Sequence, residues 1–151
     1  MTARRESQVK DIVPFKELYI YTDGASRGNP GAAGAGIIIF NEDGKIIKRI
    51  KKYLGNTTNN VAEYLALIIA LKESLKLKGD VIHLFSDSEL IVRQIKGVYK
   101  VRDRKMRVLS NEVKKLLSKF IQYDIICIDR RKNKEADRLA NLAIDEQNRD
   151  Y

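Results

Sequence analysis

The sequence predicts an α/β domain built on a mixed five-stranded sheet flanked by helices. Three strand-like runs follow one another on short turns between residues 18 and 54, which is typical of an antiparallel meander. Helical periodicity begins at Val61, and short apolar runs then alternate with further helical segments, which is typical of crossover connections. With 44% hydrophobic residues among 151, the chain can build one compact core.

The first part of the chain contains the meander. Residues 18–22 are β-branched or aromatic and predict the first strand. Residues 24–34 are rich in Gly, Asn and Pro, so we expect a loop there. Residues 35–40 and 45–54 predict the second and third strands. The Asp-Gly pair in residues 41–44 indicates the hairpin turn between them.

Helices and strands alternate in the rest of the chain. The helical face that starts near Val61 ends before residues 78–80. Right-handed crossovers would place the fourth strand beside the first and parallel to it. The remaining predicted elements are strands at 81–85 and 120–128, helices at 88–95, 106–119 and 133–146, and a charged loop at 97–105.

The charge of the chain suggests the class of its partner. Lys and Arg number 29 against 20 Asp and Glu, a net charge of +9. This excess favours nucleic acid, although a surface charged for solubility would give the same value. One cysteine and one histidine, Cys127 and His83, argue against a disulfide, a structural zinc site and a histidine triad. Both lie in apolar runs, so we expect a buried cysteine and a structural histidine.

The two ends of the chain are predicted to lie outside the domain. Residues 1–14 are polar and lack the apolar core of a signal peptide, and residues 147–151 are polar as well. We therefore expect one domain at residues 15–146 between a flexible N-terminal tail and a short C-terminal tail. No apolar run is long enough to span a bilayer. We expect a cytoplasmic monomer that does not bind membranes.

Four acidic residues, Asp23, Glu63, Asp87 and Asp137, lie at predicted ends of elements. Asp23 and Asp87 follow strands, where open α/β sheets place their sites, and the other two lie in first turns of helices. Each also has a structural explanation. Asp87 could cap the helix that follows, Glu63 could form a capping box with Asn60, Asp137 could favour a helix dipole, and Asp23 could be a turn residue.

Taken together, the four carboxylates predict a site for divalent cations. Mg²⁺ takes oxygen ligands, and two such ions about 4 Å apart can stabilise the attacking and leaving oxygens of a phosphodiester. Carboxylates gathered this closely should repel one another without metal. We therefore expect the pKa of one or more of them to be raised.

Four motifs resemble type 1 ribonuclease H in order and spacing across residues 18–143. The resemblance implies the ribonuclease H fold and an endonuclease that cuts the RNA strand of RNA/DNA hybrids, leaving 5′-phosphate and 3′-hydroxyl ends. It also implies two Mg²⁺ ions, with Mn²⁺ as a substitute, and R-loops and primers as targets. The motifs are Tyr21-Thr22-Asp23-Gly24-Ala25-Ser26 with Gly28-Asn29-Pro30-Gly31, Thr57-Thr58-Asn59-Asn60-Val61-Ala62-Glu63, Ser86-Asp87-Ser88, and Asn133 to Asp137.

The resemblance also assigns a role to each carboxylate. Asp23 would bridge both ions, and Glu63 and Asp87 would hold the ion on the leaving-group side. Asp137 would share the ion that carries the attacking water. Glu63 would also touch a 2′-hydroxyl, the group that distinguishes RNA from DNA.

Hybrid-binding residues are implied in the same way. Asn29 would contact the hybrid near the cleavage site, and Thr58 and Asn59 would contact a phosphate and base edges of the DNA strand. Asn60 is a further candidate, and free N–H groups at the start of the helix would face a phosphate. Helix capping explains Thr58 and Asn59 equally well, and both roles can coexist.

The chain departs from well-known bacterial members at two places. The loop at 129–133 has arginines where they have a histidine, as in archaeal and some bacterial members. Arg130 or Arg131 would face the phosphate, but an arginine cannot act as a general base. The basic segment 96–107 is too short for their extra helix. We expect it to bind the DNA backbone through Lys100, Arg102 and Arg104 rather than serve as a plain solvated loop.

Two other functions remain open from the sequence. One is a catalytically silent module that binds hybrids, which the presence of all four carboxylates disfavours. The other is a related nuclease or transferase on the same fold, such as a resolvase, an integrase or the nuclease domain of a reverse transcriptase. Double-stranded RNA is a further candidate substrate on which the sequence is silent.

Overall fold

The computed structural model describes residues 15–149. The N-terminal tail expected at 1–14 lies outside the described residues, as do residues 150 and 151. The last helix continues to Arg149, so it includes residues 147–149, which were expected to be tail. Within residues 15–149, no helix has both the length and the apolar character needed to cross a membrane.

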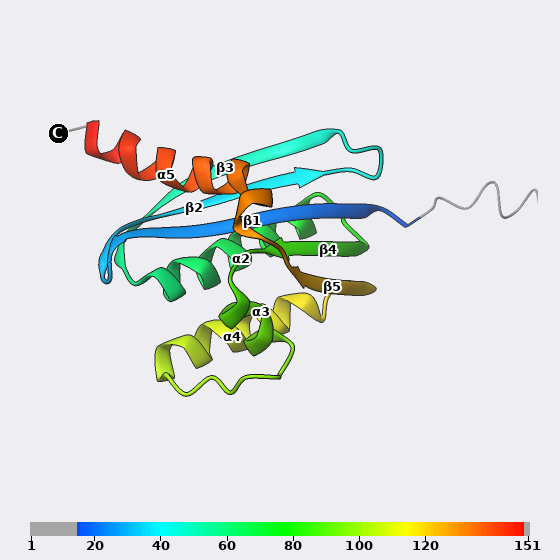
Figure 1. The fold of residues 1–151 in the computed structure, drawn as a ribbon. Coiled ribbons are helices and arrows are strands. Elements are labelled where there is room, and N and C mark those ends of the chain that lie inside the picture. Colours follow the sequence, from blue (N-terminus) through cyan, green and yellow to red (C-terminus); the bar gives the residue numbers. More distant parts are fainter. Residues whose placement is uncertain (1–14, 150–151) are drawn as a thin grey trace, which may run out of the picture.

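Five strands form one mixed sheet in the order β3-β2-β1-β4-β5 (Figure 1). The antiparallel meander and the parallel strand beside β1 are both confirmed. Strand β5 also runs parallel to β4. The bounds of the strands are β1 Glu17–Gly28, β2 Gly31–Phe40, β3 Ile46–Thr57, β4 Val81–Ser86 and β5 Gln122–Cys127.

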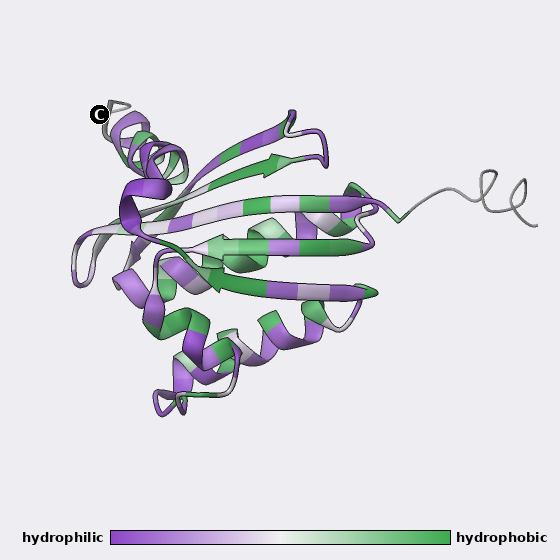
Figure 2. Ribbon diagram, turned by 45° about the vertical axis from the view of Figure 1, so that its right-hand side comes forward, coloured by the Kyte–Doolittle hydropathy of each residue, from purple (hydrophilic) through white to green (hydrophobic). Residues whose placement is uncertain are grey.

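Helices cover both faces of this sheet (Figure 1). Helices α2 (Asn59–Lys76), α3 (Glu89–Ile95) and α4 (Arg104–Leu117) lie on one face. Helix α5 (Lys134–Arg149) lies on the other face over β1, β2 and β3, after the short 3₁₀ helix η1 (Arg130–Lys132). Figure 2 shows apolar and polar residues alternating along α4, as expected for a helix with one buried face.

The helix caps test two of the structural explanations for the carboxylates. Thr58 caps α2 and Ser88 caps α3, each with a side-chain oxygen that accepts a backbone N–H. Asp87 therefore does not cap α3. Glu63 lies in the second turn of α2, not the first, and accepts a hydrogen bond from the N–H of Gly24 instead of closing a capping box.

The loop predicted at residues 24–34 is wrong. Strand β1 continues through Asp23 to Gly28 and β2 begins at Gly31, so only the turn at 29–30 separates them. The small residues that suggested a loop instead let helices approach the sheet. A Cβ added to Gly24 would lie 2.3 Å from the carbonyl carbon of Ala62 on α2. The small residues of this segment therefore indicate close packing of helices on the sheet, not a loop.

The hydrophobic core lies between the sheet and helices α2, α3 and α4. Its side chains are almost entirely removed from water, and each fully buried Leu or Ile stabilises the fold by roughly 1.5–3 kcal/mol. They come from four strands and from all three helices, and include Leu18, Ile20, Ile37, Ile39, Tyr64, Leu67, Leu71, Ile82, Leu84, Ile91, Leu117 and Ile125.

The outer strands β4 and β5 lie beyond the cover of α5. On this face His83 stacks on Tyr19 with ring centroids 4.6 Å apart, and its two ring nitrogens contact Glu17 and Asp124. The predicted structural role of His83 on a strand agrees with these contacts. Cys127 is exposed, contrary to expectation, because β5 is an edge strand and Cys127 is its last residue.

Candidate active site

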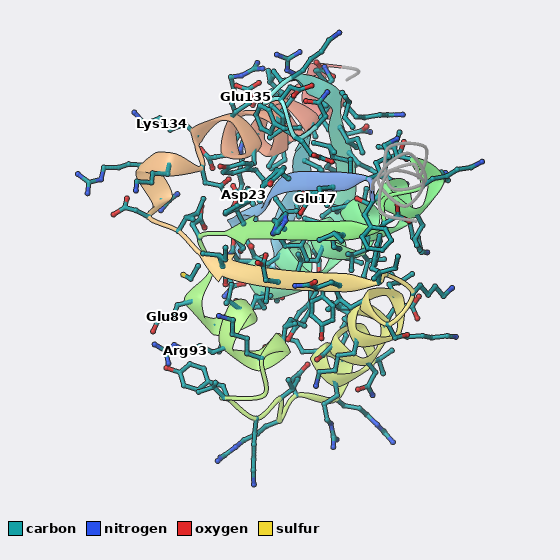
Figure 3. All side chains as sticks on the ribbon, turned by 90° about the vertical axis from the view of Figure 1, so that its right-hand side faces the viewer. Glu17, Asp23, Glu89, Arg93, Lys134 and Glu135 are labelled. Atoms are coloured by element: carbon teal, nitrogen blue, oxygen red, sulfur yellow. The ribbon has the colours of Figure 1, made fainter. Side chains whose placement is uncertain are left out.

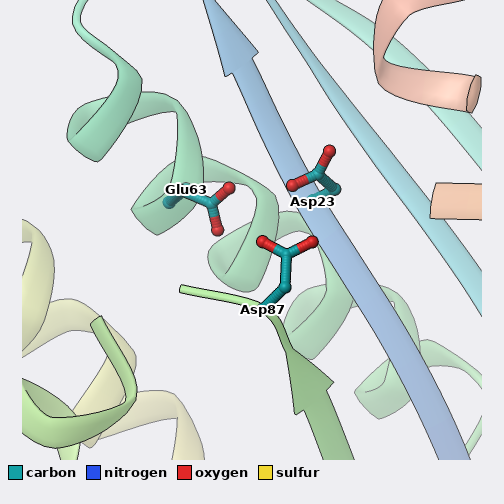
Figure 4. Close-up of side chains that lie close together, drawn as sticks. All are labelled: Asp23, Glu63 and Asp87. Atoms are coloured by element: carbon teal, nitrogen blue, oxygen red, sulfur yellow. The ribbon is translucent and has the colours of Figure 1, made fainter. Parts of the chain in front are cut away.

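Three carboxylates from three separate elements meet beside the centre of the sheet (Figure 4). Asp23 comes from β1, Glu63 from α2, and Asp87 from the residue after β4. One carboxylate oxygen of each lies within 4.8 Å of those of the other two. Asp23 is only 6% exposed and Glu63 only 3%, so two of the three carboxylates are buried.

Strand geometry explains why Asp23 and Asp87 meet. The parallel pairing of β1 with β4 ends at Tyr21 opposite Phe85. Asp23 and Asp87 each follow that last pair by two residues, so both side chains project from the same face of the sheet. The prediction that both follow the ends of neighbouring strands is correct for Asp87. It is wrong for Asp23, which lies within β1 and follows only the end of the parallel pairing.

The fourth carboxylate lines the same cleft, and its side chain contacts that of Asp23. Asp137 is in the first turn of α5 and lies outside the close group of three. Figure 3 shows Asp23 between the start of α5, marked by Lys134 and Glu135, and helix α3, marked by Glu89 and Arg93. The cleft has a volume of about 400 Å³ and is lined by Asp23, Gly24, Ala25, Ser26, Asn59, Glu63, Asp87, Ser88, Arg130, Asp137 and Asn141.

A buried asparagine holds Asp87 in place. Asn133 is 1% exposed, and its Nδ2 donates to Oδ2 of Asp87 at 3.1 Å and to the carbonyl oxygen of Thr22 at 2.8 Å. Asn133 therefore joins the residue before α5 to β1 and to the end of β4. In the sequence it was only the first residue of a motif, and its position before a carboxylate did not reveal this contact.

Burial is the main cause of the raised pKa values of Asp23 and Glu63. Loss of solvation raises the pKa of Asp23 to about 10, and the charge of Glu63 adds to the effect. Burial also raises the pKa of Glu63 to about 7, although hydrogen bonds from Asp23 and from the N–H of Gly24 oppose it. The predicted rise agrees with these values, but repulsion between the acids contributes less than burial.

The two arginines of the loop before α5 have different surroundings. Arg130 lines the carboxylate cleft, and its charge lowers the pKa of Glu63. The side chain of Arg131 is 86% exposed and forms hydrogen bonds and an ion pair with Asp129. Of the two candidates, Arg130 is thus the one that faces the carboxylates.

The residues expected to bind the hybrid divide between two hollows. Asn59 lines the carboxylate cleft, and its N–H donates to Oδ1 of Asn29 at 3.1 Å. Asn29, Thr58 and Asn60 line a neighbouring groove of about 520 Å³ together with Lys105 and other residues at the start of α4. Thr58 caps α2, which confirms its structural explanation, and its contact with the hybrid stays a prediction.

The basic segment lies apart from the carboxylate cleft. Lys100 lines a third hollow of about 340 Å³, which it shares with Arg107 and Lys114 of α4. Arg102 and Arg104 are exposed just before α4 and at its first residue. The structure therefore does not bring these three cations next to the carboxylates, and any contact they make is with a ligand that extends beyond the cleft.

The donor set of the cleft fits a hard divalent cation. Its converging ligands are carboxylate oxygens, without the thiolate or imidazole groups that softer metals prefer. Burying Asp23 and Glu63 together is costly for their ionised forms, and a bound cation would offset that cost. The residues at this position are therefore suited to Mg²⁺ or Mn²⁺.

Comparison with known proteins agrees with this geometry. A family model described as reverse transcriptase-like matches residues 21–143. The crystal structure of RNase H1 from Halobacterium salinarum superposes with a TM-score of 0.85 at 38% identity, covering 86% of this chain and 98% of that one. The chain belongs to the ribonuclease H family. Its membership confirms the resemblance that the four motifs indicated.

Other relatives define how far this ribonuclease H match extends. The chain is 39% identical over 129 residues to ribonuclease HI of Halobacterium salinarum, and covers 65% of its length. It is 38% identical to bifunctional protein Rv2228c of Mycobacterium tuberculosis, and spans 36% of that longer protein. LC11-RNase H1 in complex with an RNA/DNA hybrid superposes with a TM-score of 0.81 at 42% identity, covering 86% of this chain and 98% of that one.

Proposed function

We propose that this ribonuclease H is an endonuclease that hydrolyses the RNA strand of RNA/DNA hybrids and leaves 5′-phosphate and 3′-hydroxyl ends. The close group of Asp23, Glu63 and Asp87, of which the first two are buried, with Asp137 at the same cleft, is the observation that carries the proposal. The chain has a net charge of +9, which suits a nucleic acid. The crystal structure of LC11-RNase H1 with a hybrid supports the choice of substrate.

Asp23, Glu63, Asp87 and Asp137 would hold two Mg²⁺ ions, with Mn²⁺ as a substitute. Such ions, when bound, activate water and stabilise the charge that develops on a phosphodiester. The protein supplies carboxylate oxygens that are already held in place around the cleft. Gly24 fixes Glu63 through its N–H, and Asn133 fixes Asp87 through its amide, so both carboxylates are oriented before any ligand arrives.

Other groups of the chain would bind and align the substrate. Arg130 is permanently charged and would neutralise a phosphate beside the cleft, while proton transfer must come from other groups. In the groove that it shares with Asn29 and Asn60, Thr58 would take a phosphate of the DNA strand, and Asn59 would reach base edges. Asn29 would contact the hybrid near the cleavage site. Glu63 would contact the 2′-hydroxyl and so select RNA.

We further propose that the enzyme works as a cytoplasmic monomer on R-loops and primers. R-loops and primers both contain an RNA strand paired with DNA, which is the substrate class inferred above. The domain proposed from the sequence, residues 15–146, contains all four carboxylates and every proposed binding residue.

The proposed function predicts metal-dependent cutting of the RNA strand in a labelled RNA/DNA hybrid. The chain and its Asp87→Asn variant would be compared with Mg²⁺, with Mn²⁺ and with EDTA. Single-stranded RNA, double-stranded RNA and double-stranded DNA would serve as control substrates. We expect cleavage of the hybrid with either metal, and its loss in EDTA or in the variant. Tight hybrid binding without cleavage in any metal would instead indicate a silent binding module.

The basic segment should contribute a salt-dependent part of hybrid affinity. Each phosphate contact that is lost flattens the slope of log affinity against log salt by roughly 0.9. Replacing Lys100, Arg102 and Arg104 together with Ala should therefore reduce the slope by up to roughly 2.7, while cleavage at saturating substrate is kept. Fluorescence anisotropy with a labelled hybrid in Ca²⁺ or without metal would measure it.

A second triple variant controls for the change in net charge. Lys72, Lys76 and Lys119 are exposed and lie near the ends of α2 and α4 that are remote from the cleft. Replacing these three with Ala removes the same charge and should leave the salt slope nearly unchanged. Equal slopes in the two triple variants would place the binding surface elsewhere.

A further inference from the structure

Asp137 is held by a side chain one turn further along α5. Nδ2 of Asn141 donates to Oδ1 of Asp137 at 3.2 Å and to its main-chain oxygen at 3.0 Å. Residues four apart on a helix are neighbours, so the pair is built into α5 itself. One oxygen of the Asp137 carboxylate is engaged in this way, which also sets the direction of the other. Asn141 lines the same cleft as the buried acids.

Arg27 of β1 determines which way round the Asn141 amide lies. Its Nη2 donates to Oδ1 of Asn141 at 3.4 Å and to the main-chain oxygen of Asn141 at 3.3 Å. A guanidinium only donates hydrogen bonds, and an ionised carboxylate only accepts them. If the amide were flipped, its NH₂ would face Arg27 and its oxygen would face Asp137. Both contacts would then be repulsive, so one orientation is strongly favoured.

Arg27 also connects this pair to the strand that carries Asp23. The two residues are four apart on β1, so their side chains project from the same face of the strand. Nη2 of Arg27 forms an ion pair with Asp145 at 2.7 Å, with the two side chains 41% and 44% exposed. Exposed ion pairs add little to stability. The arrangement is therefore better explained by orientation of Asn141 than by a gain in stability.

We propose that Asn141 and Arg27 are positioning residues for Asp137. Arg27 fixes the amide of Asn141, Asn141 fixes one carboxylate oxygen of Asp137, and the second oxygen is thereby aimed into the cleft. The inference rests on the proposed function, in which Asp137 serves the ion on the side of the attacking water. Neither positioning residue needs to touch the substrate or the metal.

Kinetics of single and double variants test the order of these contacts. Asn141→Ala should lower kcat by about tenfold, with KM for the hybrid within about twofold, because outer partners of metal ligands typically have effects of this size. The Mg²⁺ concentration for half-maximal activity should rise. Arg27→Leu should have a smaller effect. Because the two residues act in series, the double variant should be no worse than Asn141→Ala alone.

A measurement on the metal-free protein tests the contact without catalysis. In the wild type, the two Nδ2 protons of Asn141 should give separate NMR resonances that exchange slowly with water. Arg27→Leu removes the partner of Oδ1, so these resonances should shift toward those of a free amide and exchange faster. Unchanged amide resonances in Arg27→Leu would overturn the proposal whatever the activity of the protein.

A matched control separates positioning from simple anchoring of α5. Lys51 of β3 and Glu146 of α5 form another exposed ion pair between the sheet and this helix, away from Asp137. Lys51→Ala should leave kcat, KM and the Mg²⁺ dependence unchanged. Additive effects of Asn141→Ala and Arg27→Leu, or wild-type kinetics in Asn141→Ala, would refute the positioning role of these two residues and leave the proposed function standing. A wild type that cuts no hybrid would refute the proposed function. The amide resonances would still test whether Arg27 fixes the Asn141 amide.

Discussion

Replacing Asp23 with Asn is expected to abolish hybrid cleavage and, at the same time, to stabilise the metal-free protein above neutral pH. Asp23 is buried beside Glu63 and Asp87, and burial raises its pKa to about 10. At pH 8 the folded protein must either keep a proton on Asp23 or bury its charge. Asn has nearly the same shape and no charge, so the variant avoids this cost but loses a cation ligand.

The direction of the pH dependence follows from proton linkage. Between an unfolded pKa near 3.8 and a folded pKa of about 10, native Asp23 binds a proton that the unfolded chain releases. The unfolding free energy of the metal-free wild type should therefore fall as pH rises through this window. Glu63, with a pKa raised to about 7, adds to the fall below that pH. The Asp23→Asn substitution should remove the larger part of this pH-dependent fall in unfolding free energy.

Denaturant unfolding in EDTA between pH 5 and 9 would measure this effect. We expect Asp23→Asn to exceed the wild type by on the order of 3 kcal/mol at pH 8, and by less at pH 5. Adding Mg²⁺ should stabilise the wild type and leave the variant nearly unchanged. Asp43→Asn, in the exposed hairpin, is the matched control. A variant less stable than the wild type at every pH would show that the carboxylates are not strained without metal.

Replacing Gly24 with Ala should both destabilise the fold and disrupt the site. The new Cβ would lie 2.3 Å from the carbonyl carbon of Ala62 and 2.4 Å from the backbone nitrogen of Glu63. Helix α2 would have to move away from β1, which would also break the hydrogen bond from Gly24 to Glu63. We expect a loss of about 3 kcal/mol in unfolding free energy and a fall of roughly 100-fold in kcat.

Gly55→Ala provides the control for glycine itself. Gly55 has a φ of +80° and no atom within 4 Å of an added Cβ, so Ala there costs only backbone strain, about 1 kcal/mol. Thermal unfolding and cleavage would be measured for both variants. If Gly24→Ala cost no more than Gly55→Ala, close approach of α2 to β1 would not be what brings Asp23 and Glu63 together.

The order of elements could be predicted from the sequence because each signal is local. Alternation in the meander, the Asp-Gly turn and helical periodicity after Val61 depend on neighbours in the chain, and the crossover rule then fixes β4 beside β1. The error at residues 24–34 arose because small residues have two uses. Composition cannot distinguish a turn from a strand against which helices pack closely.

The candidate site was predictable to the level of its acids but not of their supports. The motifs named Asp23, Glu63, Asp87 and Asp137 and offered two arginines before α5, yet only packing shows that Arg130 faces the cleft and Arg131 faces solvent. The contacts of Asn133, Asn141 and Arg27 join residues that the fold brings together over long separations or through a helix turn. A polar side chain carries no local sign of such a contact.

The carboxylates are also spread along the chain in the order in which they are synthesised. Asp23 emerges first, then Glu63 and Asp87, and Asp137 is added only after β5 has been made. Domains fold as units during synthesis, and α5 must pack over β1, β2 and β3 before Asp137 reaches the cleft. A growing chain still attached to its ribosome and shorter than this point thus has no complete site.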